Sequence, residues 1–196
     1  MTIVLDGTTG ITTPTTDSTA EHVTSVTGFK ALQDRFNEAF EYRDGDLYWK
    51  INPNKSKKHI GKLAGYNKDT SSYGIVMLDK KSYCLHRVIY CMHTGLMPVV
   101  VDHINGQYKD HRIENLRSAD HHTNNYNKGV QKNNKLGIKN VCWNAQNKKW
   151  WVQVRAKGKT MIAAMFDDLE LAELVAVEAR NKFHGEFANH GEFICL

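Results

Sequence analysis

The feature that most constrains this chain is an apolar run that stops at an acid, a histidine and a turn. Residues 99–101 lead directly into Asp102 and His103, and Asn105-Gly106 follows as a turn signal. Neighbouring side chains on a regular strand point to opposite faces, so Asp102 and His103 can serve one site only where the strand ends. We therefore expect a strand that ends at this pair.

A short polar helix is expected after this strand. Ser118 is a candidate N-cap for a helix over residues 119–127, because a serine side chain can accept a hydrogen bond from a first-turn N–H. Asn124 lies inside this helix and can face back toward Asp102. The order strand, turn and helix would then bring the polar side chains together.

These residue types suit the hydrolysis of a nucleic-acid backbone. That reaction needs a base to activate water and a cation to neutralise the charge that grows on the phosphate and the leaving oxygen. His103 is the candidate base, because the pKa of an unperturbed imidazole is about 6.5. Asp102 and Asn124 offer a carboxylate and an amide oxygen, which suit Mg²⁺ or Mn²⁺.

The ordered set of residues resembles the HNH, or ββα-metal, nucleases, and in particular the branch found in phage homing endonucleases. The matching positions are Leu85-His86-Arg87, Gly95, Pro98, Asp102-His103-Ile104-Asn105-Gly106, Asp110, Arg112, Asn115-Leu116-Arg117 and Asn124. The resemblance implies an enzyme, a hydrolase that cuts phosphodiester bonds in DNA with the help of one divalent metal ion. It also implies a bacteriophage source.

Carried over by position, the resemblance gives each motif residue a role. His103 is the first letter of the motif and the general base, and Asn115 is the central asparagine, which orients the base and pins the loop. Asn124 stands at the third letter, where many members have histidine and the homing branch often has asparagine. Asp102 and Asn124 would then hold the metal ion. Two nearby residues remain alternatives at the third letter: Asn125 and Asn127.

The stretch before the motif is predicted to be a helix that ends at Gly95. Its apolar face is Leu85, Val88, Ile89 and Met92. Arg87 is a candidate phosphate contact, whereas His86 is expected to be structural. A zinc site built from the cysteines and histidines of this stretch is disfavoured, because the four cysteines of the chain form no C-x-x-C pair. Reduced thiols are therefore expected, as in the cytoplasm.

Charge is distributed unevenly along the chain. The formal net charge of the 196 residues is only +5, yet residues 121–166 contain no acid and nine lysines or arginines. A solvated face would normally mix both signs, so this run is expected to meet phosphate, with double-stranded DNA as the partner. No stretch has the length of a membrane span or the pattern of a signal peptide. We expect a monomer in the host bacterial cytoplasm that uses no small-molecule cofactor.

The chain divides into four expected parts of an α+β protein. Residues 1–27 are a disordered threonine-rich lead, and residues 28–127 form the HNH nuclease domain, which begins with a helix at about residues 29–42. Residues 128–136 are a basic linker. Residues 137–190 form a small DNA-binding domain, a three-stranded sheet plus a helix, with strands over 137–143, 149–157 and 159–166 and the helix over 168–183.

This last part is similar to the plant APETALA-two / ethylene-responsive-factor domain, which also occurs attached to phage HNH endonucleases. The matching residues are Gly137, Val141, Trp143, Lys149-Trp150, Val152, Val154-Arg155, Phe166, Glu170, Ala172 and Gly185. The resemblance implies that the sheet lies in the major groove. The candidate DNA contacts are Trp143, Trp150, Trp151 and Arg155, with Lys139, Lys148 and Lys157 on phosphates. One of the adjacent tryptophans is expected in the core, because strand neighbours alternate faces.

The sequence therefore predicts a divalent-metal-dependent DNA endonuclease of the homing type, targeted by a C-terminal DNA-binding domain. The alternative is a DNA-binding protein that keeps a degenerate HNH fold and cuts nothing. The two differ in one observable property, because only the first should cleave DNA when Mg²⁺ is added.

Overall fold

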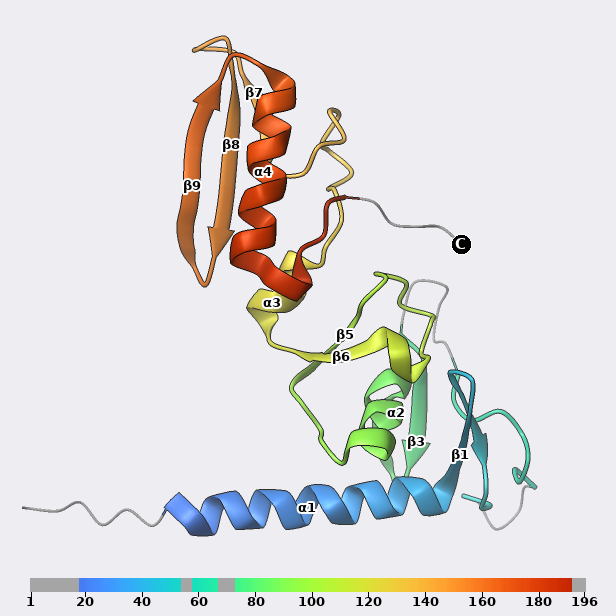
Figure 1. Cartoon of the computed structure of the whole chain (residues 1–196). Coiled ribbons are helices and arrows are strands. Elements are labelled where there is room, and N and C mark those ends of the chain that lie inside the picture. Colours follow the sequence, from blue (N-terminus) through green and yellow to red (C-terminus); the bar gives the residue numbers. More distant parts are fainter. Residues whose placement is uncertain (1–17, 54–57, 67–72, 192–196) are drawn as a thin grey trace, which may run out of the picture.

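The computed structural model describes residues 18–53, 58–66 and 73–191. Within these ranges there are three two-stranded sheets and one three-stranded sheet, all antiparallel, together with helices (Figure 1). The buried apolar side chains form two separate cores, one drawn from residues 36–116 and the other from residues 141–179. The expected mixture of helices and small sheets is confirmed.

The first helix, α1 (Ser18–Ala39), differs from the prediction at both ends. Residues 18–27 were expected to be disordered but are helical, because lengthening an existing helix adds hydrogen bonds without the cost of a new nucleus. The predicted disorder of residues 1–17 lies outside the described residues. At its C-terminal end the helix stops at Ala39, three residues before the predicted end at Tyr42, because Phe40 already belongs to a strand. Within the described ranges, no helix has both the length and the apolar content to cross a membrane.

Two hairpins follow α1 and pack into the first core. β1 (Phe40–Arg43) and β2 (Asp46–Trp49) pair around a turn at Asp44-Gly45, where both residues have positive φ. Glycine adopts that conformation without steric cost. The apolar members Phe40, Leu47 and Trp49 are all buried, which fixes the register of this hairpin.

The second hairpin leads directly into a helix that carries part of the site. β3 (Ile75–Leu78) pairs with β4 (Lys81–Cys84), and α2 (Leu85–Thr94) begins at the next residue. The helix ends as predicted, because Gly95 has a φ of 72° and donates its N–H to the Cys91 carbonyl oxygen. Its buried face joins α1 and both hairpins in one core.

The predicted strand, turn and helix of the motif are present. β5 (Val100–His103) ends at the expected pair and returns through the short 3-10 helix η1 (Ile113–Asn115) to β6 (Leu116–Ala119). The turn is where the sequence places it, because Gly106 has a φ of 71° and donates its N–H to the His103 carbonyl oxygen. α3 (His121–Tyr126) follows β6.

The N-cap of α3 is Asp120, so the prediction of Ser118 was wrong. The Asp120 carboxylate accepts a hydrogen bond from the Thr123 N–H at 2.7 Å, and the Thr123 hydroxyl accepts one from the Asp120 N–H, which makes a capping box. Ser118 lies opposite Val101 in the β5–β6 pair. Strand pairing therefore extends past the serine, and the helix is shorter than predicted at both ends.

The C-terminal part is a three-stranded sheet with one long helix on one face (Figure 1). Its elements are β7 (Val141–Asn144), β8 (Lys149–Ala156), β9 (Lys159–Phe166), α4 (Leu169–His184) and the 3-10 turn η2 (Gly185–Phe187). The secondary structure follows the predicted order, although β7 begins four residues later than predicted at Gly137. Val152 and Val154 of β8 are fully buried against α4.

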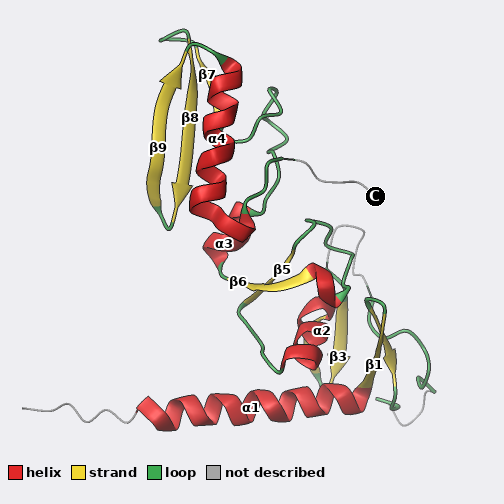
Figure 2. Cartoon of the chain, viewed as in Figure 1, coloured by secondary structure: helices red, strands yellow, loops and turns green. Residues whose placement is uncertain are grey.

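The two cores meet at α3 and the segment that follows it (Figure 2). Tyr126 at the end of α3 stacks on the His184 ring of α4, with centroids 4.0 Å apart and planes at 5°. The Lys139 ammonium donates to the carbonyl oxygens of Tyr126 and Lys128, both at 2.6 Å. These contacts connect the motif helix to the C-terminal sheet.

Candidate active site

The side chains of the motif line one cleft, of about 400 Å³. Its walls come from α2, the end of β5, the loop after β5, and α3 with the residues that follow it. Asp102, His103, Asn124 and Asn127 all contribute to this lining. The end of β5 and α3 thus bring these four residues to one cleft.

Asp102 is buried and charge-balanced. Arg117, directly opposite on β6, donates from Nη2 at 2.8 Å and from Nε at 2.9 Å to Asp102 Oδ2. The Asn127 amide donates to the same carboxylate at 3.0 Å and to the His103 carbonyl oxygen at 2.8 Å. Asn127 rather than Asn124 is therefore the asparagine in contact with Asp102, although both line the cleft.

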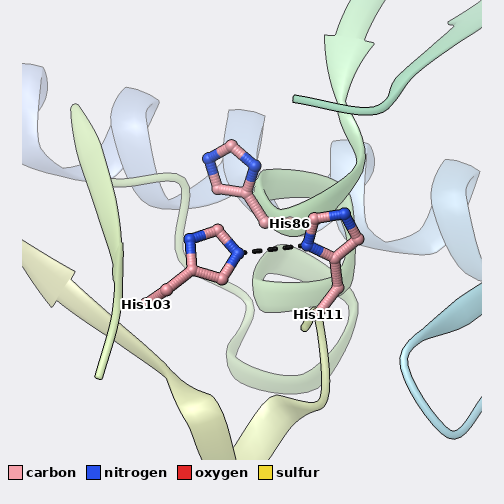
Figure 3. A group of neighbouring side chains, drawn as sticks. All are labelled: His86, His103 and His111. Atoms are coloured by element: carbon pink, nitrogen blue, oxygen red, sulfur yellow. Dashed lines mark hydrogen bonds between the residues drawn. The ribbon is translucent and has the colours of Figure 1, made fainter. Parts of the chain in front are cut away.

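His103 belongs to a cluster of three buried histidines. Its Nε2 lies 3.1 Å from Nδ1 of His111, and the ring of His86 lies 5.2 Å from its own, centroid to centroid (Figure 3). Burial lowers the pKa of His103 to about 4, and burial with the neighbouring imidazoles lowers the pKa of His86 to about 3. The pKa of His111 is also lowered by burial. Burial therefore favours the neutral form of all three rings.

Asn115 holds the loop between the two strands. Its amide donates to the Asp110 carbonyl oxygen and to Asn105 Oδ1, and its own Oδ1 accepts from the Asn105 N–H, each at 2.8–2.9 Å. This agrees with the predicted role in pinning the loop. Within the described residues, Asn115 makes no hydrogen bond to the imidazole that it is expected to orient; the His103 ring is hydrogen-bonded to His111 instead.

Positive charge reaches the cleft from α2. Arg87 lines it, and its Nη2 donates to the Pro98 carbonyl oxygen at 3.0 Å. Its Nε is buried with no hydrogen-bond partner. A guanidinium held in this way has donors left for an anion, which suits the predicted contact with phosphate.

The donor chemistry of the cleft fits a hard divalent ion. Asp102 supplies a carboxylate, and Asn124 and Asn127 carry amide oxygens, which are the ligand types that Mg²⁺ and Mn²⁺ prefer. Arg117 donates to one carboxylate oxygen of Asp102, whereas the other, Oδ1, accepts a hydrogen bond only from the Asn127 amide within the described part of the chain, at 3.2 Å. The carboxylate is thus only partly engaged.

Comparison with known proteins agrees with this geometry. A sequence profile described as HNH endonuclease matches residues 83–126, which hold α2, the β5–β6 pair and α3. Protein 3.8 of Escherichia phage T7 is 33% identical over 90 residues, which cover 45% of this chain and 72% of that protein. The chain belongs to the HNH endonuclease family. No solved structure gives a significant match.

The HNH match includes His103, Asn115 and Asn124 but ends one residue before Asn127. Members of this family are nucleases that generally depend on a metal ion. The matched range also stops well before the C-terminal sheet, so the likeness of residues 137–190 to APETALA-two domains remains a prediction.

The register of the C-terminal sheet divides the predicted DNA contacts of this HNH protein into two groups. Trp143 pairs with Trp150 on the side that faces α4, where Trp150 packs against the core. Trp151 and Arg155 alternate with the buried valines of β8 and so point to the other face. The expectation that one adjacent tryptophan belongs to the core is confirmed.

Lys139 was predicted to bind phosphate, and the structure gives it another role. Its ammonium is bound to two carbonyl oxygens at the junction of the two cores, and burial lowers its pKa to about 8. Lys148 and Lys157 are instead exposed, at turns where both have positive φ. They remain available for a phosphate backbone.

Sequence reasoning missed His111 and interpreted His86 only as a structural residue. The two residues are separated by 24 others, and each belongs to a different element from His103. No spacing rule brings a helix residue, a strand end and a loop residue together. The one available signal was composition, because four histidines fall within residues 86–111.

Proposed function

We propose that this chain is a divalent-metal-dependent DNA endonuclease of the homing type, with its C-terminal sheet as the DNA-binding part. One observation carries the proposal. The candidate base His103 and the candidate metal ligand Asp102 end the same strand and line the same cleft, which a family match independently covers.

His103 acts as the general base in this proposal. Its ring is neutral, so a lone pair is available to take a proton from water. A pKa of about 4 is low for a base that works at neutral pH. A phosphate bound beside the ring would raise it again, because a negative charge favours the protonated imidazole.

The residues that would hold the ion are Asp102 with Asn124, or with Asn127 if its amide turns its oxygen inward. When bound, Mg²⁺ or Mn²⁺ would neutralise the charge on the phosphate and the leaving oxygen. Arg87 lines the same cleft and would bind a non-bridging phosphate oxygen. Asn115 positions His103 indirectly, because its hydrogen bonds hold the loop that follows His103.

Duplex DNA is the proposed substrate because cations extend from the cleft to the sheet. Lys128 lines the cleft, and Arg155 and Lys157 line a groove between α3 and the end of β8. A protein that holds a long duplex at several such points gains affinity from each phosphate and selectivity from the side chains that reach bases. A second contact region of this kind is what a homing enzyme needs to choose a site.

One observation favours the alternative, a DNA-binding protein that does not cut. Asp102 already accepts hydrogen bonds from Arg117 and Asn127, which compete with any ion. In a protein that binds DNA without cutting it, the Asp102–Arg117 pair would serve only to stabilise the fold. Both readings predict DNA binding, so cleavage is the property that separates them.

The deciding experiment incubates supercoiled plasmid carrying phage DNA with wild type, His103→Ala and His121→Ala, in Mg²⁺ and in EDTA. His121 is an exposed histidine of α3 and serves as the matched control. We expect nicked or linear product from wild type and control in Mg²⁺ alone, and none from His103→Ala, which still binds DNA. Binding without product in any divalent ion would establish the alternative. Equal cleavage by His103→Ala would refute the role of His103.

A further inference from the structure

The three histidines around His103 form a second donor set, distinct in chemistry from the oxygen atoms beside them. His86 comes from the first turn of α2, His103 from the end of β5 and His111 from the loop before η1. One ring nitrogen of each lies within 4.8 Å of the other two (Figure 3). The side chains are buried, with 6%, 5% and 7% of their surface exposed.

The described residues do not supply hydrogen-bond partners for all the ring nitrogens of the cluster. His103 Nε2 and His111 Nδ1 share one hydrogen bond of 3.1 Å, and His86 Nδ1 is buried with no hydrogen-bond partner among the described residues. Buried polar nitrogens in folded proteins normally have a partner. A ligand that accepts lone pairs from several rings at once would supply one.

We infer that His86, His103 and His111 bind a divalent transition metal ion such as Zn²⁺, at a site separate from the oxygen site of Asp102. Three neutral imidazoles with an open fourth position are a ligand set of four-coordinate zinc. In such a site the nitrogens lie roughly 3.4 Å apart, for bonds of about 2.0–2.1 Å. In the structure one ring nitrogen of each histidine lies within 4.8 Å of the others, and those of His103 and His111 are 3.1 Å apart, so the present arrangement is close to this value.

The two neighbouring sites select different ions. Mg²⁺ is a hard cation that takes oxygen ligands, so it is expected at Asp102 and not among the imidazoles. Zn²⁺, Co²⁺ and Ni²⁺ accept imidazole nitrogen readily. His86 and His103 are fixed on α2 and β5, His111 lies in the loop before η1, and all three residues are buried, so the site is largely formed before the ion arrives.

Binding at the histidine site would stop proton transfer by His103, and this consequence rests on the proposed nuclease function. A neutral imidazole has one basic lone pair. A ring that gives this pair to a metal keeps N–H on its other nitrogen and cannot take a proton from water. Zn²⁺ is therefore an inhibitor of the Mg²⁺-supported reaction. His103 acts either as the general base or as a Zn²⁺ ligand, but not as both at once.

The test is a Co²⁺ titration of the full chain, freed of metal with EDTA and followed by visible absorption. We expect one equivalent with a four-coordinate spectrum that excess Mg²⁺ does not alter. His86→Asn and His111→Asn should each weaken binding by at least about 100-fold, since loss of outer partners alone costs 10- to 100-fold. His121→Asn should bind like wild type. Unchanged binding in both cluster variants, or displacement by Mg²⁺, overturns the site.

Two further measurements test the inference. If a cluster variant does not fold, X-ray absorption of the wild-type cobalt complex can count the imidazole ligands of the ion. Three imidazole ligands support the site, and fewer overturn it. Zn²⁺ is then added to the plasmid assay in Mg²⁺. Loss of cleavage supports the inhibitory role, and undiminished cleavage at saturating Zn²⁺ overturns it. A chain with no nuclease activity would fail only this last assay, since the titration needs no DNA.

Discussion

Arg117 and Asp102 form a buried ion pair across the β5–β6 hairpin, with Nη2 2.8 Å from Oδ2. The same guanidinium donates from Nη1 to the Glu186 carbonyl oxygen at 2.6 Å and lies over the Phe187 ring, 3.8 Å from its centroid. The candidate metal ligand is therefore connected through one arginine to the end of the C-terminal helix. This contact connects the site to η2, which directly follows α4.

Removing the charge of Arg117 should destabilise the fold. Arg117→Met keeps an apolar stem against Phe187 but leaves the Asp102 carboxylate buried without its cation. We expect a loss of roughly 3 kcal/mol in the free energy of unfolding, measured in urea, since an unpaired buried charge is costly. Arg43→Met, which breaks the exposed pair with Glu41, is the control and should change the midpoint far less. Equal effects would mean that the buried pair contributes no more than a surface pair.

Alanine substitutions of Asn127 and Asn124 should have different effects, the first mainly on the stability of the fold and the second mainly on the Mg²⁺ requirement of cleavage. Asn127→Ala removes donors to the Asp102 carboxylate and the His103 carbonyl oxygen, so the free energy of unfolding should fall by about 1–3 kcal/mol. Asn124→Ala should leave stability nearly unchanged and raise the Mg²⁺ concentration needed for cleavage. The measurements are urea unfolding and Mg²⁺ titration of the plasmid assay. A larger Mg²⁺ requirement in Asn127→Ala than in Asn124→Ala would move the metal site to Asn127.

Much of this site followed from local rules. The strand that ends at Asp102-His103 and the turn at Gly106 depend on residues within a few positions of one another, and both are present. The N-cap of α3 could not be predicted from such local rules. Ser118 and Asp120 both satisfy the local preference for a cap, and only the pairing of Ser118 with Val101 decides between them.

The histidine cluster and the position of Lys139 depend on contacts that no local pattern encodes. Lys139 belongs to a run of cations that is typical of a DNA-binding surface, yet its half-buried side chain donates to two carbonyl oxygens at the junction of the two cores. Burial of a single lysine is decided by tertiary packing. The same holds for His86, whose polar ring lies on the otherwise apolar side of α2.

Acid should destabilise the protein in a window set by the histidines. The folded-state pKa values of His86 and His103 are about 3 and about 4, whereas an exposed histidine has a pKa of about 6.5. Between these values the unfolded chain binds more protons, so stability is complete above about pH 6.5 and falls as pH decreases. Each group contributes at most about 1.4 kcal/mol per pH unit.

Urea unfolding between pH 7.5 and 4.5 measures this slope. His86→Gln should show a shallower dependence than wild type, because one buried imidazole is gone. Most carboxylates are still ionised in this range, so they add little to the slope. A stability that does not change over the window would mean that the three rings are not buried in their neutral form in solution.

DNA affinity should depend on the face of the C-terminal sheet that lies opposite α4. Trp151 and Arg155 lie on that face, whereas Trp143 lies on the α4 side at the sheet edge and packs on Trp150 with centroids 4.8 Å apart. Trp151→Ala should weaken duplex binding, because its ring lies on the face that is proposed to meet the DNA. Trp143→Ala should have a smaller effect, and fluorescence anisotropy with a labelled duplex measures both.

Lys157→Ala tests the phosphate contacts by the same method. Loss of one phosphate contact lowers the slope of log affinity against log salt by about 0.9 in magnitude and weakens binding to all duplexes alike. Lys30→Ala removes one charge from α1, where Lys30 pairs with Asp34, and should leave the slope unchanged. If both lysine variants give the same small loss, the effect is one of net charge alone. Binding by the C-terminal sheet would then lose its support, because a defined contact must depend on where the charge lies and not only on how much charge the chain carries.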